Sequence, residues 1–378
     1  MNNREIYLAR KDMPFLADYR FFNHAAISPI SLSVKKAILK GSDIQVFSRA
    51  VSSVEVDKDY REGRESIARL VGAHPDRVAF IQNTSIGMSM VALGLNVKPG
   101  QNVVVPDLEF PSNFLPWIQL EQQDVEVRRV AAIDGKITAD ALKSVVDHNT
   151  CAVALSHVQF YNGYRVDLGS IAEICLQHDA LLIVDGTQSV GAIDINVELS
   201  GVDVLVVASH KWMMGPVGTG FMSFSARAFD RIKPKLVGWL SVKDPFLFNR
   251  TLDFAGDGQR FEPGSENLVG LYGLMQRVGD IHASGIKRIE ARVRYLVDYL
   301  IETAHSAGLV WSNEFDLVHR SGIVFIKNES VKAEALHQAL IDNKVIASVR
   351  NGGIRLSPHY HNTTDEIDYL ISVTKAVR

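Results

Sequence analysis

A lysine in the second half of the chain stands in an unusual setting. Lys211 follows the apolar run VDVLVVAS (202–209) and precedes a glycine-rich stretch that ends at Gly220. Burial at the end of a strand favours the neutral amine, which is the form that attacks a carbonyl carbon. The glycines allow the backbone to pass close to a bulky ligand. Most lysines are solvated surface groups, so this pattern alone indicates a candidate nucleophile and not a site.

A carboxylate ends an earlier apolar run. Asp185 closes ALLIVD (180–185), and Gln188 follows three residues later. Ligands of open α/β sheets bind at the carboxyl ends of the strands, where Asp185 is expected. Gln188 can reach the same ligand. The alternative for an isolated aspartate before glycine is a turn residue without a ligand.

Hydroxyl side chains begin a predicted helix. Thr84 and Ser85 follow the strand-like run RVAFIQ (77–82) and open a helical pattern that reaches Leu95. Free backbone N–H groups and hydroxyls at a helix N-terminus form an anion site. A helix cap without a ligand is the simpler interpretation of this segment alone.

Together, the three groups match the needs of one cofactor, pyridoxal 5′-phosphate (PLP). The aspartate keeps the pyridine nitrogen protonated, the lysine forms the imine, and the helix start holds the phosphate. With these residues, the chain resembles the class V aminotransferase family of fold type I PLP-dependent enzymes. That family includes cysteine desulfurases, selenocysteine lyases and kynureninase. The most specific segments are VDVLVVASHKWMMGPVGTGFM (202–222) and LLIVDGTQSVGA (181–192), within a likeness that runs from Phe21 to Ser357.

The resemblance implies a role for each matching residue. Lys211 is the catalytic residue that forms the Schiff base with the cofactor. Arg355 grips the substrate carboxylate, a task suited to a planar guanidinium, and Asn23 and His24 border it. Ser265 reaches the phosphate of a neighbouring subunit, which implies a homodimer. The expected cofactor-binding residues are Asp185, Gln188, Thr84, Ser85, Phe110, Ser209, His210 and Ser265.

Three departures from the desulfurase pattern limit the function. Phe110 stands where desulfurases have a histidine on the cofactor ring, and a phenyl ring can stack but cannot carry a proton. The asparagine that desulfurases usually have in this segment is absent from its usual place, and the stretch VQFYNG (158–163) is closer to kynureninase-like members. No cysteine follows Cys175, although a desulfurase needs one within 341–352. A persulfide-forming enzyme is therefore not expected, because that chemistry requires a thiolate.

We therefore expect a PLP enzyme that acts on a small L-amino acid, as a transaminase or as a C–S lyase without the persulfide cysteine. An amino-acid epimerase or a kynureninase-like hydrolase are the alternatives. A binding protein that has lost catalysis is less favoured, because Lys211 and Asp185 are both present. His359, Tyr360 and His361 follow Arg355 closely, and they are either a second acid or base or structural residues.

The composition excludes several other partners. The net charge is −3, from 40 basic and 43 acidic residues, and no segment concentrates lysine and arginine. Neither nucleic acid nor an anionic membrane is therefore expected. No apolar run is long enough for a membrane helix, and the first residues do not resemble a secretory signal. The two cysteines have no metal-ligand spacing. We expect a cytoplasmic protein without a metal.

Alternating strand and helix patterns must position these residues. Such alternation predicts an α/β domain with a mostly parallel seven-stranded sheet, and from 264 onward the pattern changes to a smaller α+β domain. We expect the large domain over 15–282, and the small domain over 1–14 and 283–378. The predicted strands of the large domain are 77–82, 102–106, 125–130, 151–158, 180–185, 202–209 and 218–224; those of the small domain are 322–327, 345–350 and 353–358.

Overall fold

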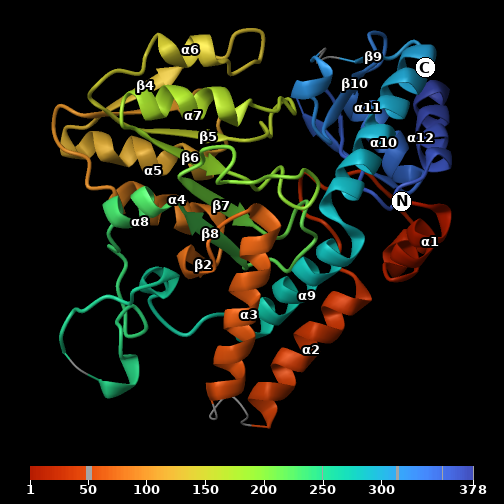
Figure 1. Ribbon diagram of the computed structural model, residues 1–378. Helices are drawn as coiled ribbons and strands as arrows, with labels where there is room; N and C mark the ends of the chain where they lie inside the picture. The colour runs from red at the N-terminus through yellow and green to blue at the C-terminus, as the bar shows by residue number, and fades with distance from the viewer. Residues whose placement is uncertain (48–52, 249, 312–314, 351, 378) are drawn as a thin grey trace.

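A seven-stranded sheet lies at the centre of the larger part of the molecule (Figure 1). The structure, a computed structural model, describes residues 1–47, 53–248, 250–311, 315–350 and 352–377. β8 runs antiparallel to both of its neighbours, and the other pairings are parallel, so the predicted mostly parallel sheet is confirmed. Across the sheet the strands are β2 (Val78–Ile81), β8 (Gly220–Phe224), β7 (Val204–Ala208), β6 (Leu181–Asp185), β5 (Thr150–Ser156), β3 (Asn102–Pro106) and β4 (Glu126–Val130).

Side chains that alternate along the strands fill two cores, one on each face of this sheet. Ile183 belongs to the core that includes residues of α4 (Thr84–Gly94), whereas Leu182 and Val184 belong to the core that includes residues of α7 (Leu168–Gln177). Burial on both faces explains why these strands read as uninterrupted apolar runs. The shorter helices of this part are α5 (Leu115–Ile118), α6 (Ala139–Lys143) and α8 (Ala226–Arg231).

Because the parallel strands share one direction, their carboxyl ends meet at one edge of the sheet. Ser156 at the end of β5 is the register partner of Asp185 at the end of β6. Asp185 in turn pairs with Val206 of β7, and the chain leaves β7 two residues later, just before Lys211. The sheet therefore brings the predicted aspartate and lysine to the same edge.

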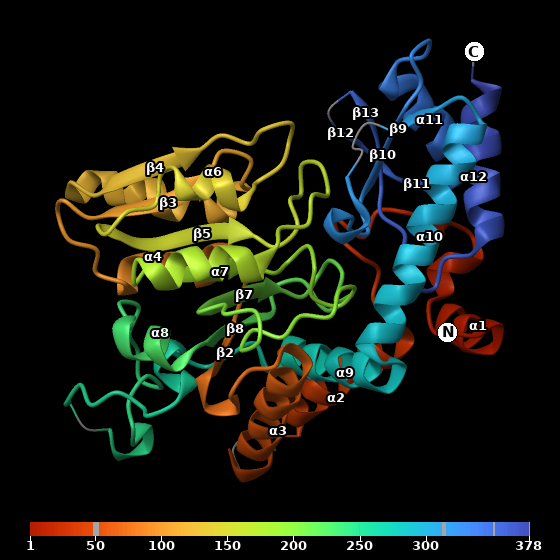
Figure 2. The same ribbon diagram turned by 45° about the horizontal axis from the view of Figure 1, so that its top comes forward.

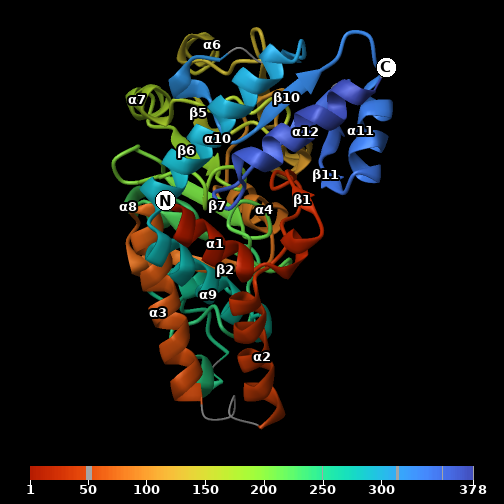
Figure 3. The ribbon, with the colours of Figure 1, turned by 90° about the vertical axis from the view of Figure 1, so that its right-hand side faces the viewer.

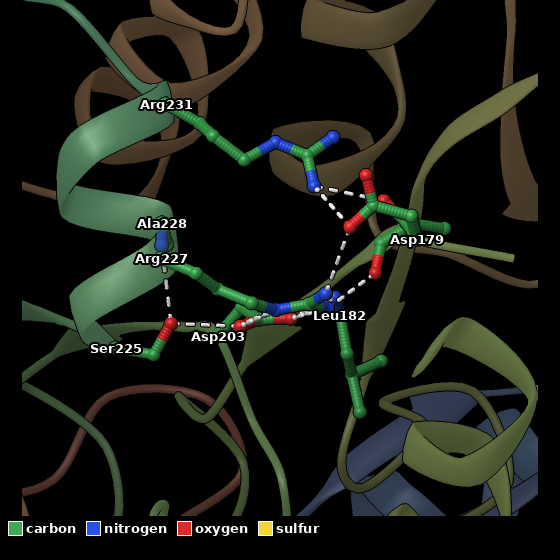
Figure 4. A network of polar contacts seen from close by, with 8 residues as sticks. Asp179, Leu182, Asp203, Ser225, Arg227, Ala228 and Arg231 are labelled. Carbon is green, nitrogen blue, oxygen red and sulfur yellow. Dashed lines mark hydrogen bonds and ion pairs between the residues drawn. The ribbon is translucent and has the colours of Figure 1, made fainter. Parts of the chain in front are cut away.

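An ionic network attaches α8 to the opposite end of β7 (Figure 4). Asp203, which is buried, accepts hydrogen bonds from Arg227 Nε at 2.7 Å, from Ser225 Oγ at 2.7 Å and from the Leu182 backbone N–H at 2.9 Å. Arg231 reaches the exposed Asp179 at 3.1 Å. The network fixes the start of β7 and leaves its other end to the site.

Three long helices lie together below the sheet in Figures 1 and 3: α2 (Leu32–Val46), α3 (Ser53–Val71) and α9 (Leu268–Ser284). The sequence shows a helical pattern over 264–305 with a break near Gly285, which predicts α9 and the helix after it, but it did not lead us to predict α2 or α3. Gly285, with φ +80°, separates α9 from α10 (Ile286–Ser306), as that break predicts. A side chain rarely adopts that backbone conformation, so glycine suits this break.

A second, antiparallel sheet lies in the smaller C-terminal part of the molecule (Figure 2). Its strands, in order, are β12 (Ser348–Arg350), β13 (Gly353–Leu356), β10 (Val324–Lys327) and β9 (Val310–Trp311), and α10, α11 (Ala333–Asp342) and α12 (Thr364–Ala376) accompany it. Helix α1 (Asn3–Lys11) lies on the same side of the molecule. This agrees with an α+β arrangement. The division into 15–282 and 1–14 with 283–378 stays a prediction.

The predicted single strand 345–350 is wrong in detail. It forms two strands in different sheets, because β11 (Val345–Ile346) pairs in parallel with β1 (Arg20–Phe21), whereas β12 pairs with β13. The pairing with β1 ties the N-terminal segment that contains Asn23 and His24 to the C-terminal part. None of the helices in the described ranges is long and apolar enough to cross a membrane.

Candidate active site

A cavity of about 150 Å³ opens at the carboxyl edge of the large sheet. It brings together seven of the residues that the sequence singled out. Additional lining residues that the sequence analysis did not select include Ser112, Ser156, Phe160 and Thr187. The predicted residues in the lining are Thr84, Ser85, Phe110, Asp185, Gln188, His210 and Lys211.

Lys211 occupies the turn that follows β7. Its carbonyl oxygen accepts hydrogen bonds from Ser28 Oγ at 2.6 Å and from the Met214 backbone N–H at 2.9 Å, which fix the backbone of the turn. Burial lowers the pKa of the Lys211 amine to about 8; the carboxylate of Asp185 opposes this shift and the guanidinium of Arg355 adds to it. A larger fraction of neutral amine is therefore available near neutral pH than for an exposed lysine.

Asp185 ends β6 and is buried, with 6% of its surface exposed. Its Oδ1 atom accepts the Thr187 backbone N–H at 2.9 Å. Burial raises the pKa of Asp185, and the hydrogen bonds from Thr187 and the charge of Lys211 oppose the shift. A buried carboxylate of this kind is suited to pair with a cationic ring nitrogen.

The start of α4 forms one end of the cavity. Asn83 caps the helix, since its Oδ1 accepts the Ile86 backbone N–H at 3.0 Å, and Thr84 and Ser85 occupy the first turn. Thr84 Oγ1 lies 2.9 Å from Thr187 Oγ1, and Ser85 Oγ lies 2.8 Å from Ser112 Oγ. Hydroxyl groups at the positive end of a helix suit an anion such as phosphate. Burial lowers the pKa of the nearby His210.

The residues present fit PLP. Within the described ranges, neither Lys211 nor Asp185 takes part in an ion pair within 4 Å, although both are largely buried. Buried charges without a partner are costly, and a pyridinium nitrogen and an aldehyde would satisfy these two groups. Lys211, Asp185 and the hydroxyls at the start of α4 can therefore hold the aldehyde, the ring nitrogen and the phosphate.

Three other predicted cofactor contacts differ in how they lie relative to the cavity. Ser209 does not line the cavity, because its Oγ bonds to the Pro216 carbonyl at 2.8 Å within the glycine-rich turn. Gln188 lines the cavity, but its Nε2 donates to the Ala25 carbonyl at 3.0 Å and its Oε1 accepts from Trp212 Nε1 at 2.9 Å. Ser265 is exposed and does not line the cavity of its own chain.

The predicted substrate residues lie behind or beside the cavity and do not line it. Arg355 on β13 donates from Nη1 to the Phe160 carbonyl at 3.2 Å, so it reaches the cavity through a lining residue. Its Nε atom is buried and has no hydrogen-bond partner among the residues that the structure describes. Burial, with a smaller effect of Arg350, lowers the pKa of Arg355 to about 10. An unsatisfied guanidinium N–H at this position suits an incoming carboxylate.

Asn23 and His24 have different environments. Asn23 forms a β-bridge with Ser357, and its Oδ1 atom is buried without a partner. His24 is fully buried, and its Nδ1 lies 2.7 Å from Ser28 Oγ, the hydroxyl that holds the Lys211 carbonyl. His24 is therefore placed to support the lysine turn from behind.

His359, Tyr360 and His361 are buried and do not line the cavity. His359 Nε2 donates to the Trp212 carbonyl at 2.9 Å, because its Nδ1 accepts the Tyr360 backbone N–H at 2.8 Å. Burial lowers the pKa of His359 to about 3. These contacts favour a structural role over a second acid or base.

Glu109 is the main polar group that the sequence analysis passed over. It lies three residues after the end of β3 and is buried next in the chain to Phe110, which lines the cavity. A carboxylate at the carboxyl end of a predicted strand is the same signal that identified Asp185, and it was available in the segment LEFPSN (108–113).

Neither cysteine belongs to the site. Both are buried, Cys151 near the start of β5 and Cys175 in α7, whereas the cavity lies at the other end of β5. Burial raises the pKa of Cys175 to about 12. Among the residues whose structure is described, no group of histidine, cysteine, aspartate and glutamate side chains is arranged to hold a metal ion.

Comparison with known proteins gives a consistent result. The model of the family "Aminotransferase class-V" matches residues 44–370 of this chain. A probable cysteine desulfurase of Methanothermobacter thermautotrophicus is 30% identical over 383 residues, which cover 96% of this chain and 95% of that protein. The uncharacterized aminotransferase YcbU of Bacillus subtilis is 27% identical over 362 residues, with 96% and 95% covered.

Solved structures share the fold. The apo cysteine desulfurase from Thermococcus onnurineus NA1 superimposes with a TM-score of 0.89 at 24% identity, over 99% of this chain and 98% of that chain. The cystine C–S lyase C-DES, in complex with its reaction product cysteine persulfide, gives a TM-score of 0.88 at 20% identity, over 96% and 99%. At these identities the likeness shows the fold alone.

Proposed function

Because the chain belongs to the class V aminotransferase family, and is therefore a PLP-dependent enzyme of fold type I, we propose that it acts on a small L-amino acid as a transaminase or a C–S lyase. The observation that carries this proposal is the position of Lys211, whose amine shares one cavity with Asp185 and with the hydroxyls at the start of α4. The bound cofactor supplies an electron sink for the pair of electrons left at Cα.

Each residue has a defined task in this proposal. The Lys211 amine takes the Cα proton, and its tether to the turn after β7 holds it beside the bond that breaks. Asp185 keeps a positive charge on the ring nitrogen. Thr84, Ser85 and His210 hold the phosphate. Arg355 binds the substrate carboxylate with the N–H groups that the protein leaves free, and Asn23 borders the same place.

The fate of the substrate is limited by which groups can move protons. Among the described residues that line the cavity, the acids and bases are Asp185, His210 and Lys211. Epimerisation requires a second base on the opposite face of Cα, and in this proposal His210 and Asp185 are already assigned to the phosphate and the ring nitrogen. A persulfide on the protein would need a thiol, and both cysteines lie away from the site. Transamination or loss of a β-substituent remains.

The relatives fit both branches. One is named a probable cysteine desulfurase and another an uncharacterized aminotransferase. We further propose a homodimer in which the exposed Ser265 loop approaches the neighbouring site. The two buried, unpaired cysteines fit the reducing cytoplasm that we propose as its location.

Product analysis distinguishes the branches. The purified, PLP-loaded protein is given a panel of L-amino acids without any 2-oxo acid. One equivalent of 2-oxo acid, with the cofactor left as its amine, identifies a transaminase. Many turnovers that yield ammonia and a 2-oxo acid, such as pyruvate and sulfide from cysteine, identify a lyase. If no amino acid changes the cofactor spectrum, the proposal is wrong.

A further inference from the structure

A buried carboxylate lies directly behind the wall of the cofactor cavity. Glu109 is 6% exposed and is held between the segment after β3 and the end of β5. Its Oε1 accepts the Ser156 backbone N–H at 2.7 Å and Gln159 Nε2 at 2.6 Å. Its Oε2 accepts Asn113 Nδ2 at 2.8 Å and lies 2.5 Å from Ser156 Oγ.

These four contacts are not equivalent. The Ser156 backbone N–H and the N–H₂ groups that Gln159 and Asn113 turn towards the carboxyl group act as donors. Asn113 is fixed in this orientation because its Oδ1 accepts Trp117 Nε1. The Ser156 hydroxyl can also accept. When Glu109 is ionised, this hydroxyl donates to Oε2. When Oε2 carries a proton, that proton is donated to Ser156 Oγ, and the hydroxyl proton is free to turn elsewhere.

The hydroxyl proton of Ser156 can then point into the cofactor cavity, because Ser156 is one of the residues that line this cavity. Burial raises the pKa of Glu109 to about 7, although its hydrogen bonds with Ser156, Gln159 and Asn113 oppose the shift. Both protonation states are therefore accessible near neutral pH. The Glu109–Ser156 pair connects a titratable group to the cavity without exposing it to solvent.

The other charged groups around this pair are known. The side chains that contact Glu109 from β5, from the segment after it and from the segment after β3 are uncharged. On β6, Asp185 is the register partner of Ser156. Lys211 and His210 lie in the same cavity, and Arg355 contacts the Phe160 carbonyl next to Gln159. The adjacent His157 is buried, and its Nδ1 has no hydrogen-bond partner.

We propose that Glu109 delivers a proton through the Ser156 hydroxyl to the leaving group of a substrate in the cavity. The inference rests on the lyase branch of the proposed function. The electron pair left at Cα forms a Cα=Cβ bond as the C–S bond breaks, and the C–S pair stays on sulfur. The sulfur takes the Ser156 hydroxyl proton while Glu109 passes its own proton to Ser156 Oγ, so the products at this stage are a thiol and the unsaturated amino acid. Lys211 holds the proton from Cα, so the site has gained one proton and lost one. Glu109 regains a proton from water after the product leaves.

This relay supplies what Phe110 cannot. The phenyl ring next to Glu109 in the chain has no proton to give, whereas the carboxyl group behind it does. Ser156 is the catalytic residue of the pair, because it faces the cavity, and Glu109 acts through it.

Leaving groups that differ in their need for a proton test the relay. Glu109→Gln keeps the shape of the side chain but cannot donate an acidic proton, and Ser156→Ala removes the link. Both changes should lower kcat/KM for an S-alkyl-L-cysteine by about 10²–10⁴-fold. Elimination from β-chloro-L-alanine should change only slightly, because chloride leaves without a proton. An equal loss for both substrates would show that the pair is merely structural and would overturn the proposal.

Trp117→Phe is the matched control. Trp117 Nε1 donates to Asn113 Oδ1 at 3.2 Å, so this change disturbs the same network without touching the carboxyl group. Its effect should be the same on both substrates.

Infrared titration gives a readout that needs no turnover. The difference spectrum of the wild-type protein minus Glu109→Gln, with and without PLP, should show a protonated carboxyl band that disappears as the pH rises through neutrality. The difference is needed because burial also raises the pKa of Glu266 to about 7. No such band below neutral pH would overturn the relay even if elimination occurs. If the band is present but neither substrate is eliminated, the lyase branch itself is wrong. The infrared result does not depend on either variant being active.

Discussion

The Nζ atom of Lys211 lies 5.2 Å from the centre of the Phe110 ring. Both side chains line the same cavity, with Asp185 in the wall. An aromatic ring in this position can pack against a flat ligand, and it leaves the proton transfers to other side chains. The lysine amine is a base that lies close to this ring.

Lys211→Ala should abolish the covalent attachment of PLP to the protein. The wild-type protein should yield a borohydride-reducible adduct on Lys211. Mass spectrometry of a proteolytic digest identifies the modified lysine. Activity should fall by at least about 10³-fold, because both the attachment and the Cα base are lost. Lys233→Ala, at an exposed position, should keep the adduct. An undiminished adduct on another lysine would show that the assignment is wrong.

The rate at which the apoprotein captures PLP should depend on pH in a defined way. Only the neutral amine attacks the aldehyde, and burial lowers the pKa of Lys211 to about 8. The rate should rise about tenfold per pH unit below that value and level off above it. Stopped-flow absorbance of the forming adduct measures this. A rate that continues to rise up to the pKa of an ordinary lysine would show that burial does not lower the pKa of Lys211.

Arg355→Lys should weaken substrate binding much more than cofactor binding. The ammonium group keeps the charge but cannot present the planar pair of N–H groups, so KM should rise by about 10–100-fold. The Kd for PLP should change little, since Arg355 does not line the cofactor cavity.

Arg350→Lys provides the control for this change. Arg350 is exposed on the neighbouring strand β12 and should have little effect on KM. Equal losses of PLP and substrate binding in Arg355→Lys would rule out its assigned role.

Local sequence patterns predicted those parts of the fold that depend on neighbouring residues. Leu181–Asp185 is uninterruptedly apolar up to its final aspartate, so both the strand and the position of Asp185 at its end follow from the pattern. The start of α4 at Thr84 follows from the cap residue Asn83 in the same way. Lys211 depends on the strand before it, and that strand was equally clear.

Long-range packing determined what the sequence patterns did not predict. The contact of Arg355 with the Phe160 carbonyl joins residues 195 positions apart, and only the meeting of β13 with the loop after β5 creates it. His24 lies behind the Lys211 turn because the pairing of β1 with β11 carries the N-terminal segment there. The helices α2 and α3 pack against α9. The periodic signal of α2 is weak, whereas α3 is clearly amphipathic, so its sequence pattern could have predicted that helix.

Buried histidines should make the protein sensitive to acid. His361 is fully buried, and within the described part of the chain neither of its ring nitrogens has a hydrogen-bond partner. Burial lowers its pKa well below the ordinary value. Below about pH 6.5, His361 is therefore protonated in the unfolded chain but not in the folded chain. The free energy of unfolding therefore falls as the pH drops from that value, by up to about 1.4 kcal/mol per pH unit for this group.

His361→Leu should reduce this acid sensitivity. Urea unfolding of the variant at several pH values from neutral downward should show a smaller loss of stability than the wild-type chain, by about 1 kcal/mol for the first full unit below pH 6.5. His148→Leu, at an exposed position, should leave the slope unchanged. Equal slopes in the wild-type chain and His361→Leu would mean that His361 is hydrated and protonated in the folded state.

Asp203→Asn should destabilise the large sheet without affecting the site. Each oxygen of the Asp203 carboxylate accepts an N–H group that can only donate, Oδ1 from Arg227 Nε and Oδ2 from the Leu182 backbone and from Arg227 Nη2 at 2.6 Å. An amide would therefore turn its own N–H₂ towards one of these donors. Breaking one side of such a buried pair typically costs about 3–5 kcal/mol. Because Arg227 is about one-third exposed, at 32%, we expect about 2–3 kcal/mol in urea unfolding. Glu121→Gln is the control, since Glu121 and Arg129 are largely exposed and 3.9 Å apart, and it should cost less than about 1 kcal/mol.

The PLP content and kcat of Asp203→Asn should stay unchanged, because Asp203 precedes β7 at the end opposite Lys211. A loss of cofactor at full stability would show that the two ends of the strand are coupled.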